Sequence, residues 1–198
     1  MTSQVLSRGF PLVCIGGSAG GFEAYARLLT RLAPDTGAAI VIVNHIRSQE
    51  TSLHEALGHF TEMPVELISE RLVVKPNHVF IIPANRDLHV SDGEFRLKPV
   101  SKPRGWPDVI TVFLRSLAQH WNGKLVAVIV SGYDGDGSEA LCEIRDVGGL
   151  TIAQKPETAV QHEMPNSAIA SGCIDMVLDP EEIAHMIGEI AAASTGNY

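Results

Sequence analysis

Residues 12–21 read LVCIGGSAGG, an apolar run that breaks into a turn made mostly of glycine. The run at 12–15 is typical of a buried strand, and the apolar spacing over 22–32 predicts a helix directly after the turn. A strand joined to a helix in this way is a basic unit of α/β folds. Because ligands bind beyond the carboxyl ends of the strands in such folds, the turn at 16–21 is the first candidate for function.

The same alternation continues along the chain. Residues 87–90 and 94–97 flank a turn that contains Gly93, which predicts an antiparallel β-hairpin. The whole pattern predicts an α/β fold with a doubly wound, mostly parallel sheet flanked by helices, and with the hairpin near one edge. We expect a single domain over 1–198 with its core at about 11–193. The other predicted strands are 38–43, 79–82, 125–130, 150–153 and 176–178, and the other predicted helices are about 50–60, 108–120, 138–147, 165–172 and 180–191.

Composition narrows the class of protein. The 198 residues are 45% hydrophobic and 19% charged, with a formal net charge of −8. No run of Lys and Arg indicates a nucleic-acid partner. The apolar run at 38–43 is too short to cross a bilayer, and the first residues lack the long apolar stretch of a secretory signal. We therefore expect a cytoplasmic protein with no membrane insertion.

The cysteines Cys14, Cys142 and Cys173 are odd in number and far apart in the chain. They form no CxxC pair and no Cys/His spacing of a zinc site. We expect reduced, mostly buried thiols, and we expect neither a metal nor a cofactor.

Polar residues follow three of the predicted buried strands. Ser18 lies in the glycine turn, His45 follows the strand at 38–43, and Asp134 and Asp136 follow the strand at 125–130. Serine hydroxyl is a poor nucleophile that needs a base, histidine titrates near neutral pH, and a carboxylate can orient the imidazole. The sequence thus predicts a serine hydrolase with Ser18 as nucleophile.

Each of these positions has another interpretation. A glycine turn after a first strand often binds phosphate, but residues 16–21 fit neither the dinucleotide motif nor the P-loop motif. Residues 16–20 fit G-x-S-x-G, although the order Ser, His, Asp disfavours the α/β-hydrolase superfamily. His45 could be a strand-end histidine bonded to backbone. Asp134 or Asp136 could cap a helix or bind a cation, with few further ligands nearby.

Taken in order, several segments resemble the catalytic domain of the chemotaxis protein-glutamate methylesterase family, often called CheB. The resemblance extends from about Leu12 to about Leu178. The matching segments are IGGSAGG (15–21), VNH (43–45), KPNHVFIIP (75–83), PDV (107–109), VIVSGYDGDG (128–137), TIAQ (151–154) and MPNSAI (164–169).

The resemblance implies a catalytic set of Ser18, His45 and Asp136, with Ala19, Gly132 and Tyr133 in the loops around the oxyanion and substrate. It implies hydrolysis of glutamate methyl esters on the cytoplasmic helices of chemoreceptors, and deamidation of receptor glutamines. A hydrolase of the same fold acting on another ester or amide is an alternative, as is a non-catalytic signalling scaffold.

The chain departs from the family pattern at three loop positions and ahead of the domain. Ala19 replaces the usual Thr or Ser, Tyr133 replaces Met, and Asp134 replaces Gly. An extra carboxylate at Asp134 is expected to raise the pKa of a neighbouring base. The residues ahead of Leu12 contain no receiver domain. We therefore expect either control other than the usual receiver phosphorylation, or a chain that is a separated module of a longer protein.

Overall fold

Seven parallel strands form the centre of the protein in the computed structural model, which describes residues 9–45, 52–102 and 107–195. Their order across the sheet is β3-β4-β2-β1-β7-β8-β9, and every neighbouring pair is parallel. The strands are β1 (Leu12–Gly17), β2 (Ala39–Asn44), β3 (Val65–Leu67), β4 (His78–Ile81), β7 (Leu125–Ile129), β8 (Leu150–Gln154) and β9 (Met176–Leu178).

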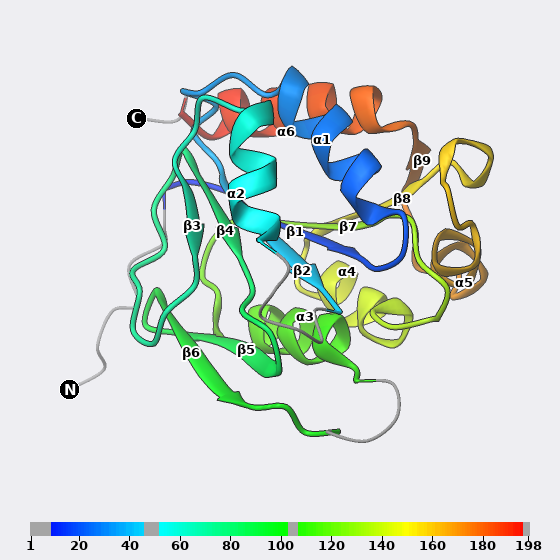
Figure 1. Cartoon of the computed structure of the whole chain (residues 1–198), viewed down its shortest axis with the longest axis horizontal. Helices are drawn as coiled ribbons and strands as arrows, with labels where there is room; N and C mark the ends of the chain where they lie inside the picture. The colour runs from blue at the N-terminus through cyan, green and yellow to red at the C-terminus, as the bar shows by residue number, and fades with distance from the viewer. Residues whose placement is uncertain (1–8, 46–51, 103–106, 196–198) are drawn as a thin grey trace.

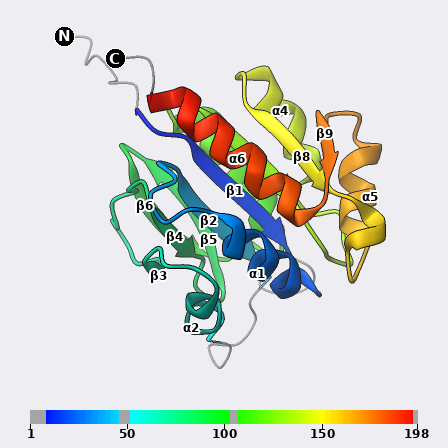
Figure 2. The ribbon, with the colours of Figure 1, turned by 90° about the horizontal axis from the view of Figure 1, so that it is seen from above.

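Helices cover both faces of this sheet (Figure 1). One face carries α1 (Gly21–Arg31), α2 (Leu53–Leu57) and α6 (Pro180–Thr195), and α1 and α6 lie side by side across β1 (Figure 2). The other face carries α3 (Val109–His120) and α4 (Leu141–Asp146). Helix α5 (Glu163–Ala170) packs beside β8. No helix within the described ranges is long and apolar enough to span a membrane.

The hairpin forms a separate two-stranded sheet of β5 (Arg86–Ser91) and β6 (Glu94–Pro99). It packs on α3 and, through Phe95, on Phe80 of β4. Asp92 and Gly93 in its turn both have positive φ, as a tight two-residue hairpin turn requires.

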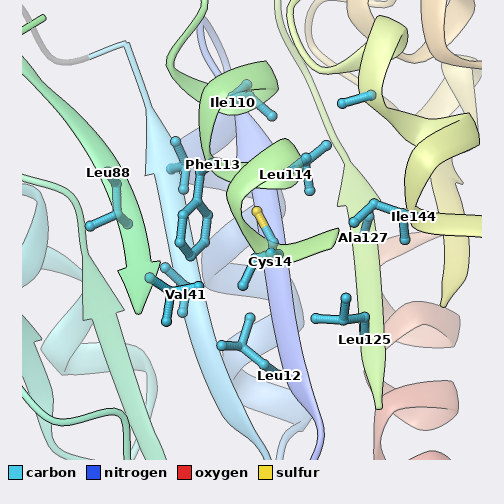
Figure 3. Close-up of a cluster of buried hydrophobic side chains, with 14 of the residues drawn as sticks. Leu12, Cys14, Val41, Leu88, Ile110, Phe113, Leu114, Leu125, Ala127 and Ile144 are labelled. Carbon is cyan, nitrogen blue, oxygen red and sulfur yellow. The ribbon is translucent and has the colours of Figure 1, made fainter. Parts of the chain in front are cut away.

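The strands at the centre of the sheet are apolar on both faces because both faces are covered. Alternate residues of β1 enter two separate cores: Leu12 and Cys14 face α3, whereas Val13 and Ile15 face α1. Figure 3 shows the first of these cores, with Phe113 of α3 lying over the central strands. Each fully buried side chain of this kind contributes about 1.5–3 kcal/mol to folding.

The prediction of a doubly wound, mostly parallel α/β fold is confirmed, while some element boundaries differ. The short edge strand β3 was not predicted, because its three residues are mostly half-exposed and carry little apolar signal. Helix α5 begins at Glu163 rather than at Pro165. Residues in the first turn of a helix donate no intrahelical N–H bond, so proline can stand at the third position as well as at the first. The helix predicted at about 50–60 is α2 followed by a 3₁₀ turn, and residues 50 and 51 lie outside the described residues.

The prediction of three reduced thiols is wrong for two of them. Cys142 at the start of α4 forms a disulfide with Cys173, which follows α5, and their Cα atoms are 5.1 Å apart. The two residues are 31 apart in sequence, so only the packing of α4 beside the end of α5 reveals the pair. Cys14 remains a free, buried thiol, and burial raises its pKa well above the ordinary value.

Candidate active site

The three central strands bring the candidate residues to one edge of the sheet. β1 lies between β2 and β7 and is parallel to both, so their carboxyl ends meet there. Ser18 follows β1, His45 follows β2, and Asp134 and Asp136 lie in the loop after β7. Residues distant in sequence are thereby grouped at the position where open α/β sheets bind their ligands.

The turn that carries Ser18 is held from both sides. The Ser18 N–H donates to the Ser131 carbonyl at 2.9 Å, and the Ser18 carbonyl accepts from the Gly21 N–H at 3.0 Å. Gly20 has φ of +73°, in the left-handed region that favours glycine. A Cβ at Gly17 would collide with the hydroxyl of Tyr25. The glycines therefore allow the chain to turn from β1 into α1 within four residues while Ser18 stays half-buried.

Two polar residues that the sequence analysis did not single out fix this turn. The Ser131 hydroxyl donates to the Ala19 carbonyl at 2.7 Å and accepts from the Gln161 N–H at 2.9 Å. The Gln154 side chain accepts from the Ser131 N–H at 3.1 Å. Ser131 and Gln154 are both buried. The sequence does carry one signal for Ser131 and Gln154, because each is a polar residue directly at the end of an apolar strand.

His45 and Asp136 are in direct contact. His45 Nε2 lies 2.8 Å from Asp136 Oδ2, and each side chain is only 3% exposed. The same carboxylate accepts the backbone N–H of Ile110 through Oδ2 and that of Thr111 through Oδ1, both at 2.9 Å. Asp136 therefore binds the first turn of α3 as well as the imidazole, which fixes its position.

The other ring nitrogen of His45 faces a second carboxylate. Nδ1 lies 3.2 Å from Asp134 Oδ2, while Asp134 Oδ1 accepts the Asp136 N–H at 3.0 Å. The Nδ1 contact is an ion pair without the direction of a hydrogen bond, because neither Nδ1 nor Asp134 Oδ2 has a hydrogen-bond partner although both atoms are buried. His45 thus lies between two carboxylates.

This arrangement controls the charge of the imidazole. Burial by itself lowers the pKa of His45, but the contacts and charges of Asp134 and Asp136 outweigh burial and raise that pKa to about 9. Burial acts to raise the pKa of Asp134, and the contact with His45 together with the Asp136 N–H lowers it. His45 is therefore a buried imidazolium at neutral pH in this arrangement.

Ser18 makes no side-chain hydrogen bond with His45 among the described residues, because both ring nitrogens face the aspartates. The structure thus brings Ser18, His45 and Asp136 to one edge of the sheet and joins the last two directly.

The loops around Ser18 contain backbone N–H groups that bond no other described residue. The Gly132 N–H donates to the Gln161 carbonyl at 3.1 Å, so it is already engaged and Gly132 shapes the loop instead. The N–H groups of Ala19 and Tyr133 donate to no other described residue. Tyr133 is 55% exposed.

Two further hydrogen bonds at this edge could not be predicted from the sequence. The Thr111 hydroxyl accepts the Gly137 N–H at 2.8 Å and so joins α3 to the loop of Asp136. Asn44 donates to the Tyr25 hydroxyl at 3.3 Å.

Within the described part of the chain, no group of three or more His, Cys, Asp and Glu residues is arranged to hold a metal ion.

Comparison with known proteins agrees with this architecture. The family model described as CheB methylesterase matches residues 13–187. The crystal structure of the Thermotoga maritima CheB methylesterase catalytic domain superposes with a TM-score of 0.82 at 29% identity, over 90% of this chain and 97% of that one.

Curated relatives match over most of this chain. A protein-glutamate methylesterase/protein-glutamine glutaminase of Burkholderia thailandensis is 34% identical over 89% of this chain and 52% of its own length. One from Mesorhizobium japonicum is 33% identical over 93% of this chain and 55% of its own length. The chain spans about half the length of these relatives. With a family match over nearly the whole fold, the chain belongs to the CheB methylesterase family.

Proposed function

We propose that the protein is a protein-glutamate methylesterase that removes methyl groups from glutamate side chains of chemoreceptors, with deamidation of receptor glutamines as a second reaction. The observation that carries the proposal is the buried contact of His45 Nε2 with Asp136 Oδ2, at the sheet edge where Ser18 follows β1. The relatives from Burkholderia thailandensis and Mesorhizobium japonicum are named as methylesterases and glutaminases, which supports the substrate class.

In the proposed mechanism, a neutral His45 accepts the Ser18 proton while Ser18 Oγ attacks the γ-carbonyl carbon of the methylated glutamate. The N–H groups of Ala19 and Tyr133 hold the oxyanion that forms. His45 then gives its proton to the departing methoxide, and methanol leaves. Water hydrolyses the acyl-enzyme by the same proton transfers in reverse, and Asp136 orients the imidazole throughout.

A receptor helix is a suitable substrate for the surface around Ser18. Large apolar side chains stay exposed there: Val160, which lies over Gly20, is 52% exposed, and Phe22 at the start of α1 is 42% exposed. An amphipathic helix can pack its apolar positions on such side chains while it presents one glutamate to the turn. Because the proposed substrate segments are the cytoplasmic helices of receptors, we place the protein in the cytoplasm.

The test is methanol release from methylated receptor, together with labelling by a serine-directed fluorophosphonate. We expect Ser18→Ala to lower kcat by about 10⁴–10⁶-fold, as loss of a nucleophile does in serine hydrolases, and to abolish labelling. Ser194→Ala is the matched control, because the Ser194 hydroxyl bonds the Ile190 carbonyl within α6 and no other described residue. Release by Ser18→Ala at the rate of the unaltered protein would exclude Ser18 as the nucleophile.

Two other outcomes correspond to the alternatives. Labelling of Ser18 without methanol release, combined with turnover of small esters, would indicate a hydrolase with another substrate. Absence of both labelling and turnover would favour a signalling scaffold that retains the fold.

A further inference from the structure

Both nitrogens of the His45 ring face carboxylates. Asp136 Oδ2 lies 2.8 Å from Nε2, and Asp134 Oδ2 lies 3.2 Å from Nδ1. The two aspartates come from one loop and are themselves linked, since Asp134 Oδ1 accepts the Asp136 N–H. The ring is therefore enclosed between two acceptors that belong to one loop.

The number of protons on the His45 ring decides how well the ring fits between the two carboxylates. Neutral imidazole carries one N–H, so one carboxylate would then face a lone pair of the ring. The imidazolium carries an N–H on each nitrogen and a positive charge, so both carboxylates face a favourable partner. A base in this state has already bound its proton and cannot accept one from Ser18.

The two contacts are not equivalent. Asp136 is held by the backbone of Ile110 and Thr111, so its position is set by α3. Among the described residues, the Asp134 carboxylate has only the contact with Nδ1 and the bond from the Asp136 N–H, and its side chain is 21% exposed, against 3% for Asp136. The facing atoms, Nδ1 and Asp134 Oδ2, are both buried without a directed hydrogen bond, so charge alone holds them together. The Asp134 contact is thus the weaker one and the one that can be released.

We propose that Asp134 is a positioning residue that holds His45 Nδ1 in a resting arrangement and thereby limits how much of the base is free to accept the Ser18 proton. The inference rests on the proposed function for its catalytic consequence, but the hold on the ring can be measured by itself. For reaction, His45 loses one proton to solvent, Nδ1 leaves Asp134, and the vacated nitrogen then takes the hydroxyl proton of Ser18.

Other charged groups of the described chain act on this edge more weakly. Lys102 pairs with Asp108 ahead of α3 and interacts with Asp136 at a distance. Cys14 of β1 also interacts with Asp136, but its thiol stays neutral because burial raises its pKa. Among these groups, only the two aspartates contact His45.

The first measurement is an NMR titration of the His45 ring in the unaltered chain and in Asp134→Asn. Asparagine keeps the shape and an oxygen for the Asp136 N–H but removes the charge. The unaltered protein is expected to titrate at about 9. In Asp134→Asn, the titration midpoint of His45 is expected to lie at least about one pH unit lower, which corresponds to an about tenfold lower proton affinity of the ring. Asp108→Asn, which removes a charge from the same edge without contacting His45, is the control and should leave the titration nearly unchanged.

The second measurement is the pH profile of Ser18 labelling by a fluorophosphonate. At about pH 7 we expect Asp134→Asn to be labelled at least about tenfold faster than the unaltered protein, with the two rates converging above about pH 9. A merely structural role of Asp134 would lower the rate at every pH and would leave the midpoint in place.

The outcomes separate the two proposals. An unchanged His45 titration and an unchanged labelling profile in Asp134→Asn overturn the role of Asp134. A lower titration midpoint of His45 in Asp134→Asn, with no labelling of Ser18 in either protein at any pH, contradicts the proposed function. The same result still establishes that Asp134 holds the ring.

Discussion

The imidazole of His45 brings a titratable charge into a buried position between two carboxylates. Its pKa is raised in the folded state to about 9 and is about 6.5 in an unfolded chain. A raised pKa stabilises the fold fully below the unfolded value, and the contribution disappears as pH rises through the folded value. One residue thus links the stability of this edge to the state of the proposed base.

We therefore expect the free energy of unfolding to fall by an amount on the order of 3 kcal/mol between about pH 6 and about pH 10 through His45. Urea unfolding at both pH values checks this, with His45→Gln as the comparison. The variant should lose most of this pH dependence even where its stability is lower overall. Equal pH dependence in the two proteins would assign the effect to other groups.

At the scale of elements, α3 depends on the candidate site for its own first turn. Its N-cap residue, Asp108, makes no side-chain cap bond, and the Asp136 carboxylate accepts the N–H groups of Ile110 and Thr111 instead. The helix also packs on β5 through Ser116, which accepts the Val90 N–H at 2.9 Å. A residue proposed for catalysis is therefore also part of the framework.

Asp136→Ala is accordingly expected to lower the free energy of unfolding by about 2–5 kcal/mol, because it leaves two buried backbone donors and the Nε2–H of His45 without an acceptor. Ser18→Ala, which removes no hydrogen bond of the folded chain described above, should change stability by less than about 1 kcal/mol. Denaturant unfolding of both variants measures the difference. Similar stabilities would show that Asp136 does not support α3.

At the scale of the whole molecule, the Cys142–Cys173 disulfide closes the chain between α4 and the segment after α5. The 31-residue separation corresponds to a stabilisation of about 3–4 kcal/mol by restriction of the unfolded chain. We expect dithiothreitol to lower the midpoint of urea unfolding, and a Cys142→Ser/Cys173→Ser variant to be insensitive to it. Three titratable thiols in the denatured, unreduced protein, rather than one, would contradict the disulfide.

Much of the fold could be predicted from the sequence. Strands that are apolar on both faces, such as 12–15 and 38–43, imply a covered parallel sheet, and the glycine turn at 16–21 marks the edge where a site is predicted. Residues 179–182 read Asp-Pro-Glu-Glu, the pattern of a capping box, and at the start of α6 Asp179 and Glu182 bond each other's backbone N–H at 2.9 Å. These features depend on neighbours within a few residues.

Other features were beyond the sequence because they depend on residues that meet only after folding. The roles of Ser131 and Gln154 under the Ser18 turn, and the pairing of Cys142 with Cys173, join separate strands and helices. A sequence pattern carries no information on such distances.

The sequence by itself determined the parallel sheet and, at one edge of it, the candidates Ser18, His45 and either Asp134 or Asp136, because periodicity and turn chemistry are local; the choice of Asp136 came from the family resemblance. Only the tertiary structure decided that Asp134 and Asp136 lie on opposite nitrogens of one imidazole. That geometry sets the charge of the ring, since electrostatic energy depends on distance and burial rather than on position along the chain.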